Sequence, residues 1–451
     1  MIKKVLIANR GEIAARIIRG CKKLAIQTVA VYSEADQKAS HVTMADESYL
    51  IGPSRVNESY LNVDKVMAVA KEAAVDAIHP GYGFLSESDS FTKKCKEEDI
   101  IFIGPTGDVM REMGSKIAAR KAMQEAGVPV VPGTDGGVTS VEEAINAAHE
   151  IGYPIMLKAS AGGGGIGMQV VQSDAELTKA YENNSKRALS FFGDGSMFIE
   201  KKLENARHIE IQLLADHHGN AVHLFERECS IQRRNQKVIE EAPSQFVSER
   251  TRNAMGDAAV NAAKALGYTN AGTIEFLVDE QENFYFLEMN TRIQVEHPVT
   301  EEITGIDIVE EQINIANGKK LKINQKDLTI DGHAIEGRIY AEDPVTFFPS
   351  PGKITKFKVP SGDSIRNETA ARNNEEITPF YDPMIGKLIV RGATREEAIL
   401  KFKDALTNYH IEGIKTNIPM LLKIADSPQF KAGNTTTSFV QNHYLPFVKS
   451  K

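Results

Sequence analysis

Cysteine is scarce in this chain, and its three cysteines stand far apart. Cys21, Cys95 and Cys229 form no Cys-x-x-Cys pair among the 451 residues. A disulfide framework is built from several cysteines at short spacings, so this pattern excludes one and indicates reduced thiols. We therefore expect a cytoplasmic protein.

Long apolar runs are missing as well. No stretch approaches the roughly 18 apolar residues of a transmembrane helix, so no membrane association is expected. The apolar run at residues 5–8 is too short for a secretory signal. A formal net charge of −8 argues against a nucleic-acid partner, although a local basic pocket for phosphate remains open. The length allows two or three domains with a large core.

The first part of the chain lacks the Gly-x-Gly-x-x-Gly fingerprint of dinucleotide-binding folds. Apolar strand patterns at residues 4–8 and 28–32 flank a helical pattern at residues 11–24, and the alternation continues to residue 104. Such alternation predicts a parallel, doubly wound (Rossmann-like) sheet. The turn at residues 9–14 departs from the fingerprint, which favours a fold element without a cofactor over a nicotinamide oxidoreductase.

Helical and proline-rich segments divide the chain into parts. A helical pattern near residue 115 is followed by Pro129 and Pro132, which indicate a boundary. The fold class that we predict is α/β, with a small lid and a C-terminal α+β domain. The predicted parts are an N-terminal domain at 1–114, a helical linker at 115–129, the lid at 130–203 and the C-terminal catalytic domain at 204–451.

Two strand patterns joined by a polar turn at residues 280–283 carry a pair of acidic residues. With this turn, Glu275 falls opposite Glu288, and Asn290 faces the same way because side chains alternate along a strand. Facing carboxylates repel each other unless a positive charge lies between them. Mg²⁺ prefers oxygen ligands and usually brings substrate phosphates, so it suits this place. The alternative is a surface hairpin whose acids are solvated.

A run of glycines stands between two further apolar strands. The run comprises Gly162, Gly163, Gly164 and Gly165. Backbone N–H groups in such a run can approach an anion without interference from side chains. No Gly-Lys-[Ser/Thr] follows, so the loop is not of the Walker type. Together with Lys158 just before it, the loop predicts a flap over a nucleoside triphosphate. A flexible linker is the alternative.

Four other features leave two interpretations open. Residues 226–237 form either a solvated hairpin or a cationic wall for an anionic substrate. Residues 79–87 follow a strand end, where parallel sheets bind ligands, but could be a structural turn. Lys116 is a surface lysine unless the flap makes it a second phosphate contact. Arg338 stands in an apolar strand, where a guanidinium needs partners or an anion.

Taken together, these segments resemble the ATP-grasp superfamily and, more closely, the biotin carboxylases, which are subunits of acetyl-CoA carboxylase. The matching strings, in the family's order, are residues 7–14, 79–87, 158–168, 288–301 and 341–344. They span nearly the whole chain. Pyruvate and propionyl-CoA carboxylases share this domain and are the competing relatives. The resemblance implies an ATP-grasp core that extends to about residue 320 and a biotin carboxylase C-terminal part from about residue 330.

The resemblance implies a role for each matching residue on the nucleotide side. Phosphate or nucleotide contacts are implied for Lys116, Lys158 and His208. Adenine contacts are implied for Glu200, Lys201 and Leu203, with Gln232 lining the nucleotide site. The metal ligands for Mg²⁺ (or Mn²⁺) would be Glu275 and Glu288, with Asn290 beside them.

Roles in bicarbonate and biotin chemistry are implied in the same way. Bicarbonate would be surrounded by Lys237, Arg292, Gln294 and Val295. Glu296 would be the general base, Arg338 would face the ureido oxygen of biotin, and Tyr82 would lie near biotin. The implied activity is that of a ligase: ATP-dependent carboxylation of biotin with bicarbonate, the first half-reaction of acetyl-CoA carboxylase, which leads to malonyl-CoA and fatty acid synthesis.

The resemblance also implies partners. No Met-Lys-Met tripeptide occurs in the chain, so we expect biotin to arrive on a separate biotin carboxyl carrier protein, with carboxyltransferase subunits acting afterwards. A homodimer is expected, and Arg16 and Arg19 lie on a plausible interface helix. Three departures from the family pattern are Ile166 in the flap, Asn235 near the nucleotide and the segment 366–376.

Two alternatives within this resemblance predict different residues. Another ATP-grasp carboxylate–amine ligase should lack the bicarbonate string at residues 292–296, which is present. A non-catalytic, ATP-binding scaffold subunit should have lost Glu296, Arg338 or Lys237, and all three are present.

Overall fold

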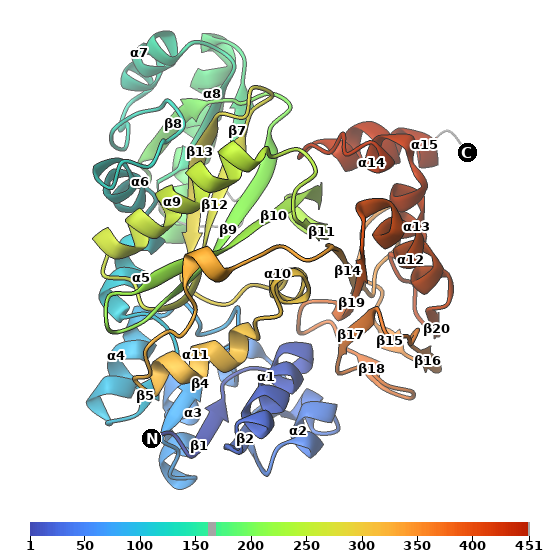
Figure 1. The fold of residues 1–451 in the computed structure, drawn as a ribbon. Coiled ribbons are helices and arrows are strands. Elements are labelled where there is room, and N and C mark those ends of the chain that lie inside the picture. The colour runs from blue at the N-terminus through green and yellow to red at the C-terminus, as the bar shows by residue number, and fades with distance from the viewer. Residues whose placement is uncertain (161–167, 450–451) are drawn as a thin grey trace.

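The structure is a computed structural model that describes residues 1–160 and 168–449. The predicted glycine flap and the departure at Ile166 lie outside the described residues. Figure 1 shows the N-terminal part at the bottom, the lid at the top and the C-terminal helices at the right, around a central set of strands. No helix in the described part of the chain combines the length and apolar character needed to cross a bilayer.

The N-terminal part contains a five-stranded parallel sheet in the order β3-β2-β1-β4-β5. Its strands are β1 (Lys4–Ile7), β2 (Gln27–Ser33), β3 (Glu47–Gly52), β4 (Ala77–His79) and β5 (Ile101–Phe102). The helices between them are α1 (Gly11–Lys23), α2 (Ser40–Met44), α3 (Val63–Glu72) and α4 (Asp89–Glu97). Val5, Leu6 and Ile7 are fully buried, as expected for a strand of a parallel sheet covered on both faces. The predicted doubly wound sheet is confirmed.

The order of this sheet places two sequence motifs side by side. β1 and β4 are neighbours whose chains continue in opposite directions across the sheet, and ligands bind at such a switch point. Residue Asn9 follows β1, and its side-chain amide donates to the carbonyls of Pro80 and Tyr82 after β4. The two loops are therefore held together at the edge that faces the rest of the molecule.

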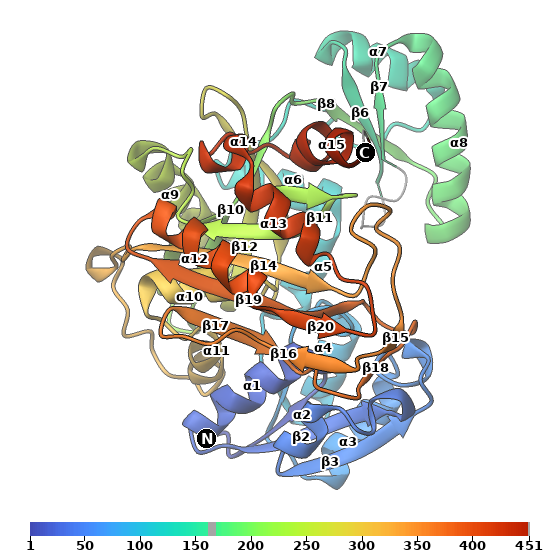
Figure 2. The ribbon, with the colours of Figure 1, turned by 90° about the vertical axis from the view of Figure 1, so that its right-hand side faces the viewer.

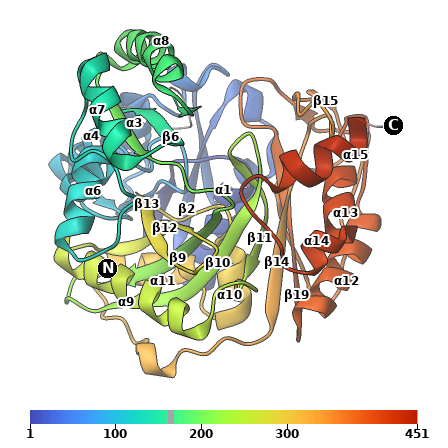
Figure 3. The same cartoon turned by 90° about the horizontal axis from the view of Figure 1, so that it is seen from above.

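The lid is a small antiparallel sheet covered by helices. Its strand order is β7-β6-β8, formed by β6 (Ile155–Ala159), β7 (Gln169–Val171) and β8 (Met197–Lys201). The helices that lead to it or pack on it are α5 (Gly107–Gly114), α6 (Lys116–Glu125), α7 (Val141–Ile151) and α8 (Asp174–Phe192). Figure 3 shows α7 and α8 at the outer side of this sheet. β6 and β7 are antiparallel neighbours, so the strands predicted on either side of the glycine run are confirmed.

The rest of the chain is organised by one eight-stranded antiparallel sheet in the order β13-β12-β9-β10-β11-β14-β19-β17. These strands are β9 (Arg207–Ala215), β10 (Ala221–Arg233), β11 (Gln236–Ala242), β12 (Asn270–Val278), β13 (Phe284–Asn290), β14 (His333–Tyr340), β17 (Ile365–Thr369) and β19 (Met384–Gly392). The two predicted halves of the C-terminal domain therefore share one sheet, joined where β11 pairs with β14.

Helices and short strands complete this part. The helices are α9 (Glu249–Ala265), α10 (His297–Thr304), α11 (Ile308–Ala316), α12 (Arg395–Thr407), α13 (Ile418–Asp426), α14 (Pro428–Lys431) and α15 (Leu445–Lys449), with a π-helical turn at Val440–Tyr444. The short strands are β15 (Gly352–Lys353), β16 (Lys356–Lys358), β18 (Glu376–Ile377) and β20 (His410–Glu412). Figure 2 shows α12 and α13 covering β14 and β19, where Phe402 and Leu421 are fully buried.

One interpretation of the polar segment at residues 226–237 is wrong. The segment does form a hairpin, since β10 and β11 pair in an antiparallel register. However, Glu226, Arg227 and Glu228 are buried rather than solvated. These strands lie inside the eight-stranded sheet, so their charged side chains had to find partners within the chain. Asn235 lies at the turn with a φ of 63°, a conformation that asparagine tolerates.

Candidate active site

Two carboxylates lie opposite each other on the paired strands β12 and β13. Glu275 is the register partner of Glu288, as the sequence predicted. Asn290 is on the same face, and its Nδ2 donates to Glu275 Oε1 at 2.9 Å. The charge of Glu275 raises the pKa of the Glu288 carboxyl. Such a repulsive pair of carboxylates, with an amide side chain beside it, would suit a divalent cation, because Mg²⁺ prefers oxygen ligands.

Lys237 on β11 connects this acidic pair to a third carboxylate. Its Nζ lies 2.6 Å from Glu210 Oε2, 2.8 Å from Glu275 Oε1 and 2.7 Å from Glu296 Oε1. Burial opposes a charge on this amine, but the three carboxylates outweigh burial and raise the pKa of Lys237 well above its ordinary value. The lysine is therefore a permanent cation in the centre of the site.

Glu296 lies between two cations and is almost fully buried. In addition to Lys237, it accepts a hydrogen bond at 3.0 Å from Arg338 on β14. Burial alone would raise the pKa of Glu296, but Lys237, Arg338 and Arg227 hold it well below its ordinary value. The carboxylate is thus deprotonated, which is the state that a general base requires.

Arg227 on β10 is fully buried and contacts several residues around Lys237 and Glu296. Its guanidinium donates to Glu210 Oε1 at 2.5 Å and to Gln294 Oε1 at 2.6 Å. Further bonds go to Gln212, Thr273 and Thr300. Gln294 in turn donates to Glu275 Oε1 at 2.7 Å, so one arginine links the loop after β13 to the acidic pair.

The loop after β13 also carries Arg292 and Val295, which were predicted to surround bicarbonate. Arg292 donates to Glu87 Oε2 at 2.9 Å and to Asn290 Oδ1 at 2.7 Å. The carbonyl of Val295 accepts a hydrogen bond at 2.6 Å from Lys387. Lys237, Arg292, Gln294 and Glu296 are thus brought together by one loop and one facing strand.

The two residues predicted to lie near biotin, Arg338 and Tyr82, each contact a buried carboxylate. Arg338 Nε donates to Glu240 Oε1 at 2.6 Å, so its predicted need for partners is met by Glu240 and Glu296. The Tyr82 hydroxyl donates to Glu12 on α1. The loop after β4 therefore contacts the first turn of α1 close to the catalytic strands.

Residues predicted to contact the nucleotide form a second group, near the lid. Lys158 pairs with Glu200 across β6 and β8. Lys116 donates to the carbonyl of Ala159 at 3.4 Å, and burial together with the charge of Lys158 lowers its pKa. The side chain of Lys201 instead donates to the carbonyls of Gly152 and Tyr153 within the lid.

The remaining residues predicted to contact the nucleotide are His208, Gln232 and Leu203. His208 Nε2 lies 2.7 Å from Glu275 Oε2. Gln232 Nε2 lies 2.8 Å from His208 Nδ1, so His208 connects Gln232 to Glu275 of the acidic pair. Leu203 is half-buried just after β8.

The structure adds site residues that the sequence reasoning did not single out. These are Glu210, Arg227, Glu87, Glu240, Glu12 and Lys387. The only sequence signal for most of them is a charged residue inside an apolar strand, the same signal that marked Arg338. Lys387, which interrupts the apolar strand β19, shows that signal and could have been found by it.

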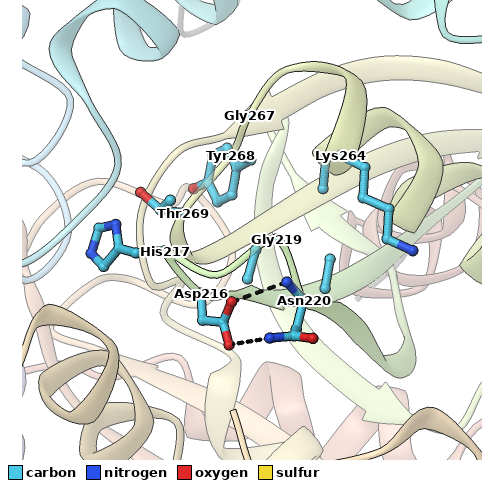
Figure 4. Close-up of a pocket in the computed structure, with 11 residues that line it drawn as sticks. Asp216, His217, Gly219, Asn220, Lys264, Gly267, Tyr268 and Thr269 are labelled. Atoms are coloured by element: carbon cyan, nitrogen blue, oxygen red, sulfur yellow. Dashed lines mark hydrogen bonds between the residues drawn. The ribbon is translucent and has the colours of Figure 1, made fainter. Parts of the chain in front are cut away.

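A separate cavity of about 320 Å³ lies away from these residues, beside the β9–β10 turn and the end of α9. Figure 4 shows Asp216 hydrogen-bonded to Asn220 in it. Asp216 also accepts from the backbone N–H groups of His218 and Leu321. Its carboxylate therefore serves the chain itself, and we assign no chemistry to this cavity.

Comparison with known proteins finds matches to three protein-family domains, which follow one another along the chain. Residues 1–110 match the biotin carboxylase N-terminal domain, residues 115–324 the ATP-binding domain of the carbamoyl-phosphate synthase L chain, and residues 336–442 the biotin carboxylase C-terminal domain. Biotin carboxylase 2 of Bacillus subtilis (strain 168) is 63% identical over 443 residues, which cover 98% of this chain and all of that protein.

Two solved structures are similar in fold as well as in sequence. A biotin carboxylase from Campylobacter jejuni in a β-γ-ATP complex has a TM-score of 0.96 at 48% identity, covering 98% of this chain and 99% of that one. The biotin carboxylase domain of the Hydrogenobacter thermophilus 2-oxoglutarate carboxylase, a dimer with MgADP, ADP and bicarbonate, has a TM-score of 0.95 at 51% identity and covers 98% of each chain.

Proposed function

The chain belongs to the biotin carboxylase family, and on that premise we propose how its residues carry out the reaction. It is an ATP-dependent ligase that carboxylates biotin, with bicarbonate and Mg²⁺ as the other participants. The observation that carries the residue-level proposal is Lys237. Its amine contacts Glu275 of the acidic pair and the predicted base Glu296 at 2.8 and 2.7 Å, which joins the phosphate side of the site to the bicarbonate side.

Bicarbonate binds on the loop after β13 in this proposal. Arg292 and Lys237 supply the positive charge, while Gln294 and the Val295 backbone fix the orientation of the anion. Glu296 takes the bicarbonate proton, and the resulting oxyanion attacks the γ-phosphorus of ATP. ADP leaves, and carboxyphosphate remains in the site.

Glu275 and Glu288, with Asn290 beside them, hold Mg²⁺, or Mn²⁺ in its place, which when bound neutralises charge on the transferring phosphoryl group. His208, Lys116 and Lys158 contact the nucleotide phosphates, and Gln232 lines the nucleotide site. Glu200, Lys201 and Leu203 hold the adenine at the junction of lid and core. The Lys158–Glu200 pair supports this division, because it lies at the junction of those two groups.

Biotin enters from the side of Tyr82 and Arg338. Carboxyphosphate breaks down to CO₂ and phosphate, and phosphate takes the proton from biotin N1′ before that nitrogen attacks CO₂. Arg338 faces the ureido oxygen and stabilises the negative charge that develops there. The glycine run, Gly162 to Gly165, is assigned to the nucleotide phosphates in this proposal, because backbone N–H groups of such a run can approach an anion without interference from side chains.

We also infer the domain limits and the setting of the reaction. The limits are 1–114, 115–129, 130–203 and 204–451; the parallel sheet, the lid sheet and the eight-stranded sheet each begin and end inside one of them. We propose that biotin arrives on a separate carrier protein and that the carboxyltransferase partner makes malonyl-CoA for fatty acid synthesis. A cytoplasmic homodimer is part of the same proposal, with helix α1 at its interface. On this helix the side chain of Arg19 is 40% exposed, so part of it is accessible to a partner. Arg16, in contrast, is buried and pairs with Glu301 and Asp307 within the chain.

The test is ADP release by the purified chain in bicarbonate buffer with Mg²⁺, with free biotin added or withheld. We expect release that depends on both bicarbonate and biotin and that falls by at least about a hundredfold in Glu296→Gln, since a general base contributes at least that factor. Glu97→Gln, on the surface of α4, is the matched control and should retain the rate. Equal release with and without biotin, or a fully active Glu296→Gln, would contradict the proposal.

The acceptor of the carboxyl group needs a second experiment. The chain is mixed with a biotinylated carrier and the carboxyltransferase subunits from the same source, and acetyl-CoA, propionyl-CoA, pyruvate or 2-oxoglutarate is added. Labelled bicarbonate should appear in malonyl-CoA. Labelling of another acceptor instead would replace acetyl-CoA in the proposal and leave the biotin chemistry intact.

A further inference from the structure

Two cations face each other across the strands β14 and β19 beneath the proposed biotin site. Arg338 and Lys387 are direct register partners, so their side chains leave the same face of the sheet. Like charges placed directly opposite each other are destabilising. Lys387 is fully buried and Arg338 nearly so, which makes the pair more unfavourable unless each cation has its own acceptors.

The two cations divide the neighbouring acceptors between them. Arg338 donates to Glu240 and Glu296, as described above. Lys387 Nζ lies 3.3 Å from Glu12 Oε1 and donates to the carbonyl of Val295 at 2.6 Å. Lys387 therefore donates one hydrogen bond to a backbone carbonyl of the loop after β13, and it faces a carboxylate from the N-terminal part.

Glu12 extends this connection to the other substrate. It lies in the first turn of α1, is buried, and accepts a hydrogen bond from the hydroxyl of Tyr82. The pKa of Glu12 is raised, because burial outweighs the opposing charge of Lys387 and the bond from Tyr82. One ion pair thus contacts the loop predicted to hold bicarbonate on one side and the tyrosine predicted to lie near biotin on the other.

We propose that Glu12 and Lys387 are a positioning pair, which holds the Val295 carbonyl and the Tyr82 hydroxyl so that bicarbonate and biotin are placed relative to each other. Neither side chain contacts a reacting atom in this account. Lys387 sets the direction of the peptide next to Glu296, and Glu12 keeps Lys387 and Tyr82 in place. The inference rests on the proposed roles of Val295 and Tyr82.

The geometry distinguishes the expected effects of three substitutions. Lys387→Met keeps most of the volume but cannot donate to Val295, so the KM for bicarbonate should rise while the KM for ATP stays unchanged. Tyr82→Phe should raise the KM for biotin and leave that for bicarbonate unchanged. Glu12→Gln can still accept from Tyr82 but removes the carboxylate that lies 3.3 Å from Lys387, while Glu368 still faces the lysine across the strands. It should therefore raise the KM for bicarbonate less than Lys387→Met does.

The experiment measures ADP release with bicarbonate, biotin and ATP varied in turn. For Lys387→Met we expect the bicarbonate KM to rise about tenfold, which corresponds to about 1.4 kcal/mol. The matched control is Lys401→Met, because Lys401 also donates to a backbone carbonyl, that of Arg391 at 3.1 Å, but lies on α12 far along the sheet. Its three KM values should equal those of the wild type.

A fall in kcat or melting temperature without a change in bicarbonate KM would mean a purely structural lysine and would overturn the inference. The double variant Glu12→Gln/Lys387→Met removes both buried charges and is used if the single variant fails to fold. It should retain the raised bicarbonate KM, and a normal value would again overturn the inference. ADP release by the wild type that does not depend on bicarbonate and biotin would instead overturn the proposed function. The two outcomes can therefore be told apart.

Discussion

Removal of the buried guanidinium of Arg227 should lower the free energy of unfolding, because this side chain holds together the strands of the eight-stranded sheet. Arg227→Met leaves Glu210 buried with one cation fewer and deprives Gln294, Gln212, Thr273 and Thr300 of their donor. Loss of one partner from a buried ion pair costs about 3–5 kcal/mol. Because Lys237 still contacts Glu210 at 2.6 Å, we expect the lower end, about 3 kcal/mol.

The assay is urea unfolding followed by circular dichroism, because the chain contains no tryptophan to report by fluorescence. The double variant Arg227→Met/Glu210→Gln removes the buried carboxylate charge as well and should recover at least about 1 kcal/mol of the loss, as neighbouring sites couple by that amount. An Arg227→Met chain that loses less than about 1 kcal/mol, or a double variant as unstable as the sum of its singles, would refute the reasoning. A matched control is Arg55→Met, which lies in an exposed turn of the N-terminal part.

Three further changes test other parts of the site. Glu288→Gln should raise the Mg²⁺ concentration for half-maximal ADP release, because one anionic oxygen ligand is lost; an unchanged Mg²⁺ requirement would exclude Glu288 as a ligand. Glu87→Gln should raise the bicarbonate KM less than about fivefold, since its bond to Arg292 is partly exposed and such pairs contribute about 0–1 kcal/mol; a much larger rise would show that Glu87 contacts the substrate. Burial raises the pKa of Glu228 from 4.5 to about 7, so its contribution to stability is present below pH 4.5 and lost as pH rises through 7. Between pH 5 and pH 8 the urea midpoint of the wild type should therefore fall relative to that of Glu228→Gln, and parallel midpoints of the two proteins would contradict this pKa.

The acidic pair shows which parts of the site can be predicted from local sequence patterns. The predicted turn at residues 280–283 and the period-two alternation placed Glu275 opposite Glu288, and this pairing is confirmed. Beside the turn, however, Val278 pairs with Phe284, and a register shift between Glu275 and Phe276 restores the predicted pairing, which the sequence pattern did not reveal. The parallel N-terminal sheet was predicted for a similar reason, because alternating strand and helix patterns have few arrangements open to them. Roles at the site came from short strings of residues that resemble the biotin carboxylases, and those roles remain proposals.

The polar segment at residues 226–237 shows where local patterns fail. A run of charged residues on a hairpin normally faces solvent, yet here Arg227 is fully buried by strands from other parts of the chain. Its contact with Gln294 joins positions 67 residues apart, and the contact of Lys387 with Val295 joins positions 92 residues apart. Contacts between residues so far apart produce no periodic pattern in the sequence, so the pattern could not predict them.

The sequence by itself determined the parallel N-terminal sheet, the two strands that carry the acidic pair and the strings that identify the family, because these depend on spacing and on residue type. Only the tertiary structure decided which charges are buried and which are paired: Lys237 among three carboxylates, Arg227 beneath them and Lys387 beside Glu12. The physical reason is that the strength of a charge interaction depends on distance and on exclusion of water. Both are set only when the eight-stranded sheet has brought distant segments together.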